Sequence, residues 1–428
     1  MKVNKTLVIG ALGFGLVGLT SVRANFVPNQ GTQAYTVIHL TGSTAFRGAT
    51  YKAVVSVLGG ENACHIAAYK ANALNAIATG YTQQQTAKYM NIYGSPDGGT
   101  TWYLVKCAWS GSEAGYFDVV NSATSESFMD DTEPEGDLGS PVIGTGNPTV
   151  ALISQSSVDL AMADNSLSFS RNKGATLAQN VAIGVIPFVY AKNAQWTPNQ
   201  VFPYTAISNI SHAQIRTLVK NGFIQTAQLV GDGTATSPKY VYLAGRNFNS
   251  GTRVNHLLNA GLATTFSEKQ TTLSGTDGNP LLSALSSASL AGQDSGGTLA
   301  TTMALRGSAT NSDTIAGLTG WYAIAYLGLP DASGAANANG GVGAVFLNLA
   351  GVTESTTAIQ QGQYTYWGTE YISESTSANA AAQNLFNLLV PGGASTVFDA
   401  AITANLEISL GSMQCSRSTD AADPVHNP

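Results

Sequence analysis

Apolar segments of strand length alternate with segments of helical periodicity along most of the chain. Strands are predicted where β-branched and aromatic residues cluster, at residues 35–40, 102–108, 158–163, 181–191, 239–244, 321–327 and 364–372. Helices are predicted where apolar residues recur at helical spacing, at residues 43–58, 213–221 (capped by Ser211), 252–260, 378–389 and 395–406. This alternation predicts an α/β fold with a largely parallel sheet.

Segments rich in Gly, Ser, Thr and Pro separate these elements. Residues 121–148 and 262–308 are predicted to be insertions, the second with one short helix, and residues 331–343 to form a flexible loop. The acidic run at residues 130–137 lacks the register of an EF-hand, so we interpret it as a solvated loop and expect no metal site there. The tail after Cys415 is expected to lack fixed structure.

The N-terminus has the pattern of a secretory signal peptide. Lys2 and Lys5 precede an apolar run at residues 7–19, and the small-residue pattern around Arg23 predicts cleavage after Ala24. A membrane anchor is the alternative, but thirteen apolar residues with many glycines are short for a span. No lipobox cysteine lies near the cleavage site, so we expect a periplasmic or extracellular protein without a lipid anchor.

Composition excludes several classes of protein. The 428 residues are enough for two or three domains, and only 10% of them are charged, against roughly 25% in an average soluble protein. The net charge of -6 and the lack of a basic run argue against a nucleic-acid partner. Among the three cysteines, export permits one disulfide, for which we expect Cys64 and Cys107, leaving Cys415 free.

Three hydroxyl-rich turns follow predicted strands and open predicted helices, at residues 41–44, 110–112 and 250–252. A helix N-terminus offers unpaired N–H groups and the positive end of its dipole, so each turn is a candidate anion site. The alternative for any one turn is ordinary N-capping, since Ser and Thr are standard capping residues.

Two charged residues lie near such turns. Arg246 follows a predicted strand and precedes Ser250 by four positions, where its guanidinium can bind two oxygens of a tetrahedral anion. Asp164 follows the strand at residues 158–163, at the end where α/β sheets place ligands. The alternatives are a solvated surface arginine and a turn-forming aspartate.

These motifs occur in one order: Thr41-Gly42-Ser43-Thr44, Ser110-Gly111-Ser112, Ala163-Asp164 and Arg246-Asn247-Phe248-Asn249-Ser250-Gly251-Thr252. That order resembles the phosphate-binding proteins of ABC phosphate transporters, which are type II periplasmic binding proteins. Residues 182–193, 207–222 and 362–372 are also similar to segments of that family. The resemblance implies an α/β, two-lobed type II periplasmic-binding-protein fold with an interlobe cleft.

The resemblance also implies a function. It predicts a solute-binding protein, not an enzyme, that captures phosphate or a similar small oxyanion, without a cofactor, as a monomer, for uptake through an ABC transporter permease. The predicted organisation is a signal peptide at 1–24, lobe 1 at 25–189, lobe 2 at 190–362, a return to lobe 1 at 363–414 and a tail at 415–428.

The resemblance assigns each site residue a role. The first helix start would donate hydrogen bonds through Ser43, Thr44 and Ala45, and the second through Ser112. The second lobe would clamp the anion through Arg246, Ser250, Gly251 and Thr252. Asp164 would accept a hydrogen bond from a protonated phosphate oxygen, which sulfate lacks at neutral pH. Two positions depart from the family pattern: Phe248 replaces the acidic residue that holds the arginine, and Asn249 replaces the glycine before Ser250-Gly251-Thr252.

The sequence fits two other classes of function less well. A hydrolase is disfavoured because the five histidines form no His-Glu-x-x-His motif and the chain has no Gly-x-Ser-x-Gly elbow. An extracellular structural protein without a ligand fits the low charge and the Ser, Thr and Gly content, but fits the ordered anion turns less well.

Overall fold

The computed structural model describes residues 34–69, 87–121, 127–129, 142–144, 152–154, 157–193, 207–231, 240–276, 279–305, 322–341, 343–402 and 406–426. The predicted signal peptide and most of the insertion at 121–148, including its acidic run, lie outside the described residues. In the described part of the chain, no helix is both long and apolar enough to cross a membrane.

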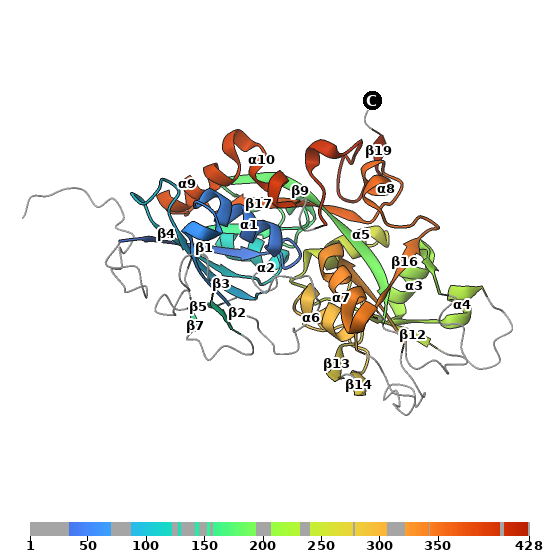
Figure 1. Ribbon diagram of the computed structural model, residues 1–428. Helices are drawn as coiled ribbons and strands as arrows, with labels where there is room; N and C mark the ends of the chain where they lie inside the picture. The colour runs from blue at the N-terminus through green and yellow to red at the C-terminus, as the bar shows by residue number, and fades with distance from the viewer. Residues whose placement is uncertain are drawn as a thin grey trace, which may run out of the picture.

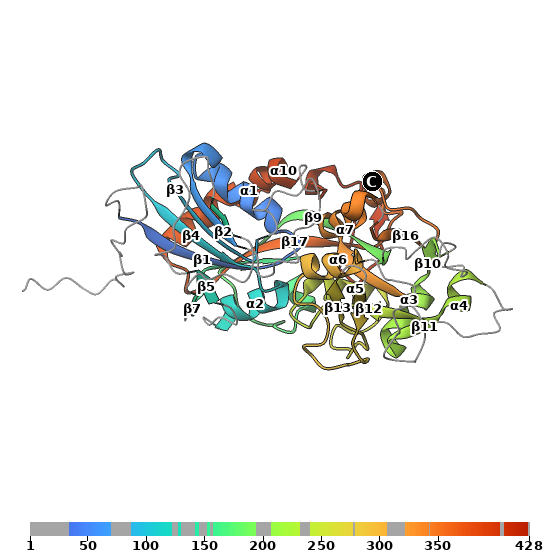
Figure 2. The same cartoon turned by 60° about the horizontal axis from the view of Figure 1, so that its bottom comes forward.

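Lobe 1 is a sheet covered by helices on both faces. Its first part contains β1 (Thr36–Gly42), α1 (Arg47–Val57), β2 (His65–Tyr69), β3 (Tyr89–Gly94), β4 (Tyr103–Ala108), α2 (Ser112–Asn121), β6 (Val142–Gly144) and β8 (Leu160–Ala163). The chain returns to this lobe in α9 (Ala380–Leu389) and α10 (Thr396–Ile402). Helices α1, α9 and α10 cover one face of the sheet and α2 covers the other (Figure 2).

Lobe 2 is built from the chain between the two crossings. Its elements are β10 (Asn209–Ile210), α3 (His212–Asn221), β11 (Phe223–Gln225), α4 (Thr226–Val230), β12 (Tyr240–Ala244), α5 (Gly251–Asn259), α6 (Gly296–Met303), β15 (Ala323–Gly328), α7 (Leu329–Gly341), β16 (Val345–Leu349) and α8 (Thr356–Gln360). Two short strand pairs flank the lobes: β5 (Ser127–Met129) with β7 (Leu152–Ser154), and β13 (Leu273–Thr276) with β14 (Asn279–Leu282).

Two long strands connect the lobes. β9 (Gln179–Lys192) and β17 (Trp367–Glu374) run side by side from one lobe into the other (Figure 1). Through them the strands join in one sheet of order β11-β12-β15-β9-β17-β8-β1-β4-β3-β2-β6. Separate apolar clusters form the cores of lobe 1 and lobe 2, so the predicted α/β class and the two lobes are both observed. The lobe boundaries given above stay predictions.

The sheet is mixed, so the expectation of a largely parallel sheet is wrong. β8, β1 and β4 are mutually parallel neighbours, but β9 and β17 are antiparallel. The antiparallel pair has a simple cause, because the chain enters lobe 2 through β9 and leaves it through β17. β2 also pairs antiparallel with β3, and β3 pairs antiparallel with β4.

Helices form within two of the segments that separate the predicted elements. Residues 331–343, predicted as a flexible loop, lie largely within α7. Alanine is the best helix former, and Ala332 and Ala335 are fully buried, so packing fixes the helix despite its Gly and Asn content. The 262–308 insertion contains the one short helix predicted for it, α6.

The tail also has structure, contrary to expectation. Residues after Cys415 form the strand pair β18 (Cys415–Ser416) and β19 (Val425–His426). The Arg417 guanidinium lies 3.8 Å from the ring centre of Trp367 and donates to the Trp367 carbonyl at 2.8 Å. Asp420 accepts a hydrogen bond of 2.8 Å from the Ser166 N–H. These contacts hold the tail against the strands that connect the lobes.

The expected Cys64–Cys107 disulfide is absent, because all three cysteines are free and buried. Cys64 directly precedes β2, whereas Cys107 is in β4, and β3 lies between these strands. Two strand spacings exceed the distance of about 7 Å between Cα atoms that a disulfide can bridge.

Candidate functional site

Three parallel strands of lobe 1 end at the same edge of the sheet. β8, β1 and β4 are neighbours, and they lead into Asp164, Ser43 and the turn before Ser112, respectively. In lobe 2, β12 leads into Arg246 and then into α5. The predicted site residues therefore meet where the two lobes face each other, as the carboxyl ends of parallel strands place ligand groups in α/β sheets.

The helix starts at this edge carry unpaired N–H groups. Within the part of the chain that the structure describes, the backbone N–H groups of five predicted site residues donate to no other atom: Thr44, Ala45, Ser112, Gly251 and Thr252. Thr44, Ser112 and Thr252 also carry hydroxyl groups, and all three residues are buried. A buried helix N-terminus without partners for its donors is the arrangement that favours an anion.

Asp164 connects the two lobes. Its carboxylate accepts a very short hydrogen bond from the Ser112 hydroxyl and one of 2.9 Å from the Thr252 hydroxyl of lobe 2. The Asn255 side chain donates to the Asp164 carbonyl at 2.6 Å. A Cβ atom on Gly251 would lie 1.8 Å from Asp164 Oδ1, so only glycine lets α5 approach the carboxylate this closely.

Arg246 is buried, with 1% of its surface exposed, so it is not the solvated arginine considered as an alternative. Its Nη2 donates to the Thr44 hydroxyl at 3.2 Å and to the Asp294 carbonyl at 3.1 Å. Its Nε donates to the Gln293 carbonyl at 3.2 Å. The guanidinium therefore reaches across to lobe 1, where it contacts the first predicted anion turn.

A second layer of polar groups fixes the backbone of Arg246. Its N–H donates to the Tyr326 hydroxyl at 2.9 Å, and that hydroxyl donates to Glu268 at 3.1 Å. Arg253 forms an ion pair of 3.4 Å with Glu268 and donates to the Arg246 carbonyl. Sequence reasoning missed Tyr326 and Glu268, because neither lies near Arg246 in the chain and neither belongs to a motif.

Two predicted residues have structural hydrogen bonds instead of free donors. The Ser43 N–H donates to the Met162 carbonyl at 2.8 Å, and its hydroxyl accepts from the Phe46 N–H. The Ser250 hydroxyl accepts from the Arg253 N–H as the N-cap of α5. Ser250 therefore acts as an ordinary N-cap, which was the alternative to an anion site. Ser43 and Ser250 nevertheless lie beside the residues whose N–H groups are unpaired.

Burial dominates the electrostatics of the site. It raises the pKa of Asp164, while the Ser112 and Thr252 hydroxyls and the Arg246 charge oppose that rise. Burial likewise raises the pKa of Glu370 well above its ordinary value, and the charge of Asp164 adds to the effect. Among the described residues, no group of three or more His, Cys, Asp or Glu side chains is arranged to hold a metal ion.

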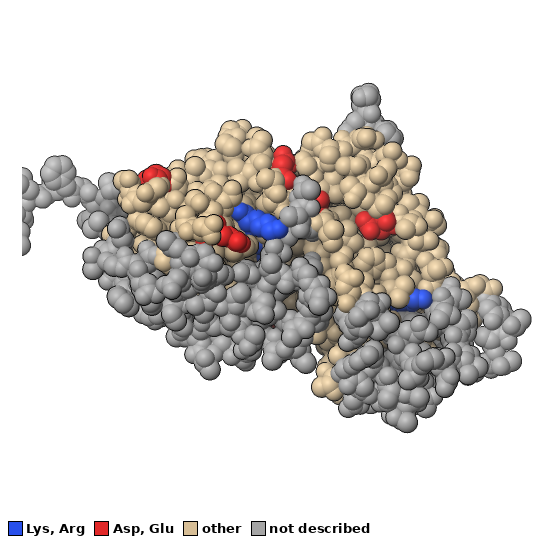
Figure 3. All heavy atoms as spheres, viewed as in Figure 1, with Lys and Arg blue, Asp and Glu red and all other residues tan. Residues whose placement is uncertain are grey.

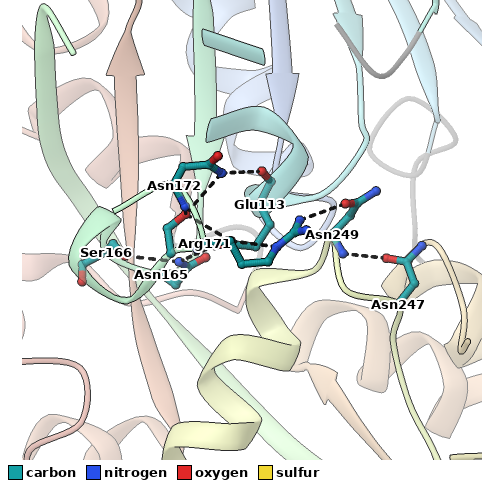
Figure 4. Close-up of polar contacts among 8 residues, drawn as sticks. Glu113, Asn165, Ser166, Arg171, Asn172, Asn247 and Asn249 are labelled. Carbon is teal, nitrogen blue, oxygen red and sulfur yellow. Dashed lines mark hydrogen bonds and ion pairs between the residues drawn. The ribbon is translucent and has the colours of Figure 1, made fainter. Parts of the chain in front are cut away.

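A polar cluster lies at the lobe boundary beside this site, formed by Glu113, Asn165, Arg171 and Asn249 (Figure 4). The Arg171 guanidinium pairs with Glu113 at 3.4 Å and donates to the Asn249 side chain at 3.1 Å. The Glu113 N–H donates to the Asn249 carbonyl at 2.9 Å, across the lobes. The guanidinium also stacks at 3.8 Å on the ring of Phe248. This interlobe polar cluster was not predicted, because a glutamate such as Glu113 is expected to be exposed at the surface.

Charged side chains are sparse on the described surface. On the face shown in Figure 3, isolated blue and red spots lie in a largely uncharged surface. The buried guanidiniums of Arg246 and Arg253 thus lie inside a protein whose exterior carries few charges.

No family model matches this chain, and no curated protein matches it. It is similar to a solved structure from Clostridium perfringens, described as a phosphate ABC transporter substrate-binding protein with bound phosphate, at 11% identity over 88% of this chain and 100% of that one, with a TM-score of 0.45. An ABC-type phosphate transport receptor from Vibrio cholerae has 12% identity over 87% of this chain and 99% of that one, with a TM-score of 0.42. PstS from Borrelia burgdorferi has 11% identity over 87% of this chain and 98% of that one, with a TM-score of 0.37. The chain is similar to these substrate-binding proteins in its mixed α/β architecture.

Proposed function

We propose that this protein is a solute-binding protein that captures a small tetrahedral oxyanion, phosphate, between its two lobes. The observation that carries the proposal is the set of unpaired N–H groups on Thr44, Ala45, Ser112, Gly251 and Thr252 beside one buried guanidinium. Several amide donors from three helix starts, together with an arginine, match the oxygens of an anion without covalent chemistry.

The carboxylate at the site favours phosphate over sulfate. An ionised Asp164 can only accept hydrogen bonds, so its ligand must carry a proton. Hydrogen phosphate carries one at neutral pH, whereas sulfate would place an unprotonated oxygen against a carboxylate. The same group that weakens anion binding in general therefore selects a protonated anion.

The direct contacts between the lobes require an opening motion. Thr252 and Asn249 of lobe 2 bond to lobe 1, so a ligand enters only when these contacts separate. Hinge closure about a few strand residues is the usual way such lobes enclose a ligand. β9 and β17 are the segments about which the lobes move.

We further propose export of the chain after removal of residues 1–24 and delivery of the ligand to an ABC transporter permease. Both statements rest on the resemblance in the sequence, and both follow only if the anion binds.

Calorimetry on the purified, phosphate-free protein tests the proposal. We expect saturable heat with phosphate, none with an equal concentration of sulfate, and a melting temperature that rises with phosphate by mass action. The Thr252→Val variant keeps the side-chain shape but removes the hydroxyl that bonds Asp164, and it should bind phosphate more weakly. Thr217→Val, on the exposed face of α3, is the matched control. If neither anion produces heat or a melting shift, the protein is not an oxyanion receptor, and a structural role is favoured.

A further inference from the structure

Asp331 lies beside Arg246, although the two residues are far apart in the chain. It belongs to the first turn of α7 and is buried, with 7% of its surface exposed. A Cβ atom on Gly296 would lie 2.0 Å from Asp331 Oδ2 and 3.3 Å from Arg246 Nη1. The carboxylate and the guanidinium therefore lie close together beside the backbone at the start of α6, where only glycine leaves room, although Asp331 Oδ2 accepts no hydrogen bond from the described residues.

Asp331 also contacts the opposite lobe. Arg47 Nη2, from α1 in lobe 1, lies 3.6 Å from Asp331 Oδ1, and each side chain is 6% exposed. A Cβ atom on Gly297 would lie 2.8 Å from the same Arg47 nitrogen. The carboxylate is thus placed between one arginine of lobe 1 and the candidate ligand arginine of lobe 2.

Carbonyl groups alone do not balance the charge of Arg246. The Gln293 and Asp294 carbonyls and the Thr44 hydroxyl orient three of its N–H bonds, but they carry no net charge. Of the acidic groups around the guanidinium, Asp331 exerts the strongest attraction, ahead of Asp164. A buried cation without an anionic partner is costly, so Asp331 stabilises Arg246 where it stands.

The geometry points to Asp331 as a positioning residue that aligns Arg246 for the anion and, through its ion pair with Arg47, makes that alignment part of lobe closure. The effect on affinity rests on the proposed function, whereas the effect on closure does not. When the lobes separate, Arg47 leaves Asp331, and Arg246 alone retains the carboxylate. When they close, Arg47 pairs with it and Arg246 donates to the Thr44 hydroxyl.

The sign of the affinity change separates positioning from simple electrostatics. Asp331→Asn removes a negative charge near an anion site, so electrostatics alone would tighten phosphate binding. Positioning predicts the opposite, a rise in Kd of about tenfold or more, because the buried Arg246 loses the acidic neighbour that attracts it most strongly. Asp97→Asn removes an equal charge from an exposed turn of lobe 1 and should leave Kd unchanged. Tighter or unchanged binding by Asp331→Asn would overturn the inference.

A double-mutant cycle tests the connection to Arg47. Arg47→Gln should raise the Kd for phosphate by less than Asp331→Asn does. Combining the two should change Kd little beyond Asp331→Asn alone, because Arg47 acts through Asp331. Independent, additive effects contradict the shared carboxylate.

Small-angle scattering supplies a measurement that needs no ligand. The radius of gyration of ligand-free Arg47→Gln should exceed that of the wild type, because the closed arrangement loses its ion pair, and Asp97→Asn should match the wild type. Equal radii of gyration for these three proteins would reject the role in closure. The test does not use Asp331→Asn, so it holds even if that variant does not fold. If wild-type protein fails to bind phosphate but Arg47→Gln still expands, the proposed function is wrong and the interlobe ion pair stands.

Discussion

Thr252, in the first turn of α5, donates a hydrogen bond of 2.9 Å to the carboxylate of Asp164, which follows β8 in the other lobe. The bond joins two lobes at the point where unpaired helix N–H groups gather. It makes Asp164 both a contact between the lobes and a candidate ligand group, so changes at this residue should alter selectivity as well as affinity.

Asp164→Asn should relax the discrimination between phosphate and sulfate. The asparagine side chain can donate as well as accept, so an unprotonated oxyanion finds a donor where the wild type presents only acceptors. We expect measurable sulfate binding together with weaker phosphate binding, both followed by calorimetry. An unchanged preference for phosphate would show that selectivity arises elsewhere.

Arg246→Ala should weaken phosphate binding by about 2–4 kcal/mol, the scale for losing charge-assisted hydrogen bonds in a buried site. Arg216→Ala is the control, because Arg216 donates to a carbonyl at the far end of α5. Circular dichroism spectra of both variants should match the wild type. Full affinity in Arg246→Ala would mean that its guanidinium serves only the fold.

The interlobe polar cluster should control how fast a ligand leaves. Arg171→Ala removes the ion pair with Glu113, the bond to Asn249 and the stacking on Phe248. Because the Arg171 side chain is 34% exposed, solvent screens these contacts, and we expect only a several-fold faster dissociation. Stopped-flow measurement of phosphate release tests this, with Lys173→Ala, on the same loop, as the control. A dissociation rate equal to the wild type would exclude the cluster from closure.

Glu268 should make stability depend on pH. Burial raises the pKa of Glu268 from its ordinary value of 4.5 to about 7. Because the folded-state pKa lies above the unfolded value, the contribution of Glu268 to the free energy of unfolding is complete below pH 4.5 and is lost as the pH rises through 7. The loss is on the order of 3 kcal/mol in all. Urea unfolding of the wild type and of Glu268→Gln at several pH values from 4.5 to 8 measures it. The variant should show a flatter profile; parallel profiles contradict the assignment.

The three free cysteines predict a simple chemical result. Burial raises the pKa of Cys64 to about 12, and it raises the pKa of Cys107 and of Cys415 as well. A thiol reagent should therefore label none of them in the native protein and all three after denaturation without a reductant. Labelling of only one cysteine in the unfolded protein would reveal a disulfide.

Local signals predicted the elements that depend on neighbouring residues. Ser211 and Gln214 form the capping box of α3, and the expected helix begins there. The turns at Ser112 and Ser250 likewise precede the helices predicted for them. Each of these signals lies within a few residues of what it specifies.

Long-range packing explains what could not be predicted. The segment around Asp331 has loop-like composition, and only its packing against α6 and β15 makes it a helix that presents a buried carboxylate to Arg246. Arg171 and Asn249 are 78 positions apart, and nothing in either segment indicates the other. Glu113 follows Ser112 directly, yet its burial depends on a loop more than 50 positions later.

The crossing of β9 and β17 has a consequence for biosynthesis. Most of lobe 2 is one stretch of chain between these strands, whereas α1 packs against α9 and α10, which follow β17 in the sequence. Because domains fold as their residues emerge, lobe 2 can form most of its core before lobe 1 does. The apolar side of α1 therefore stays exposed until α9 and α10 have been synthesised. We expect the nascent N-terminal half to bind chaperones that keep chains unfolded.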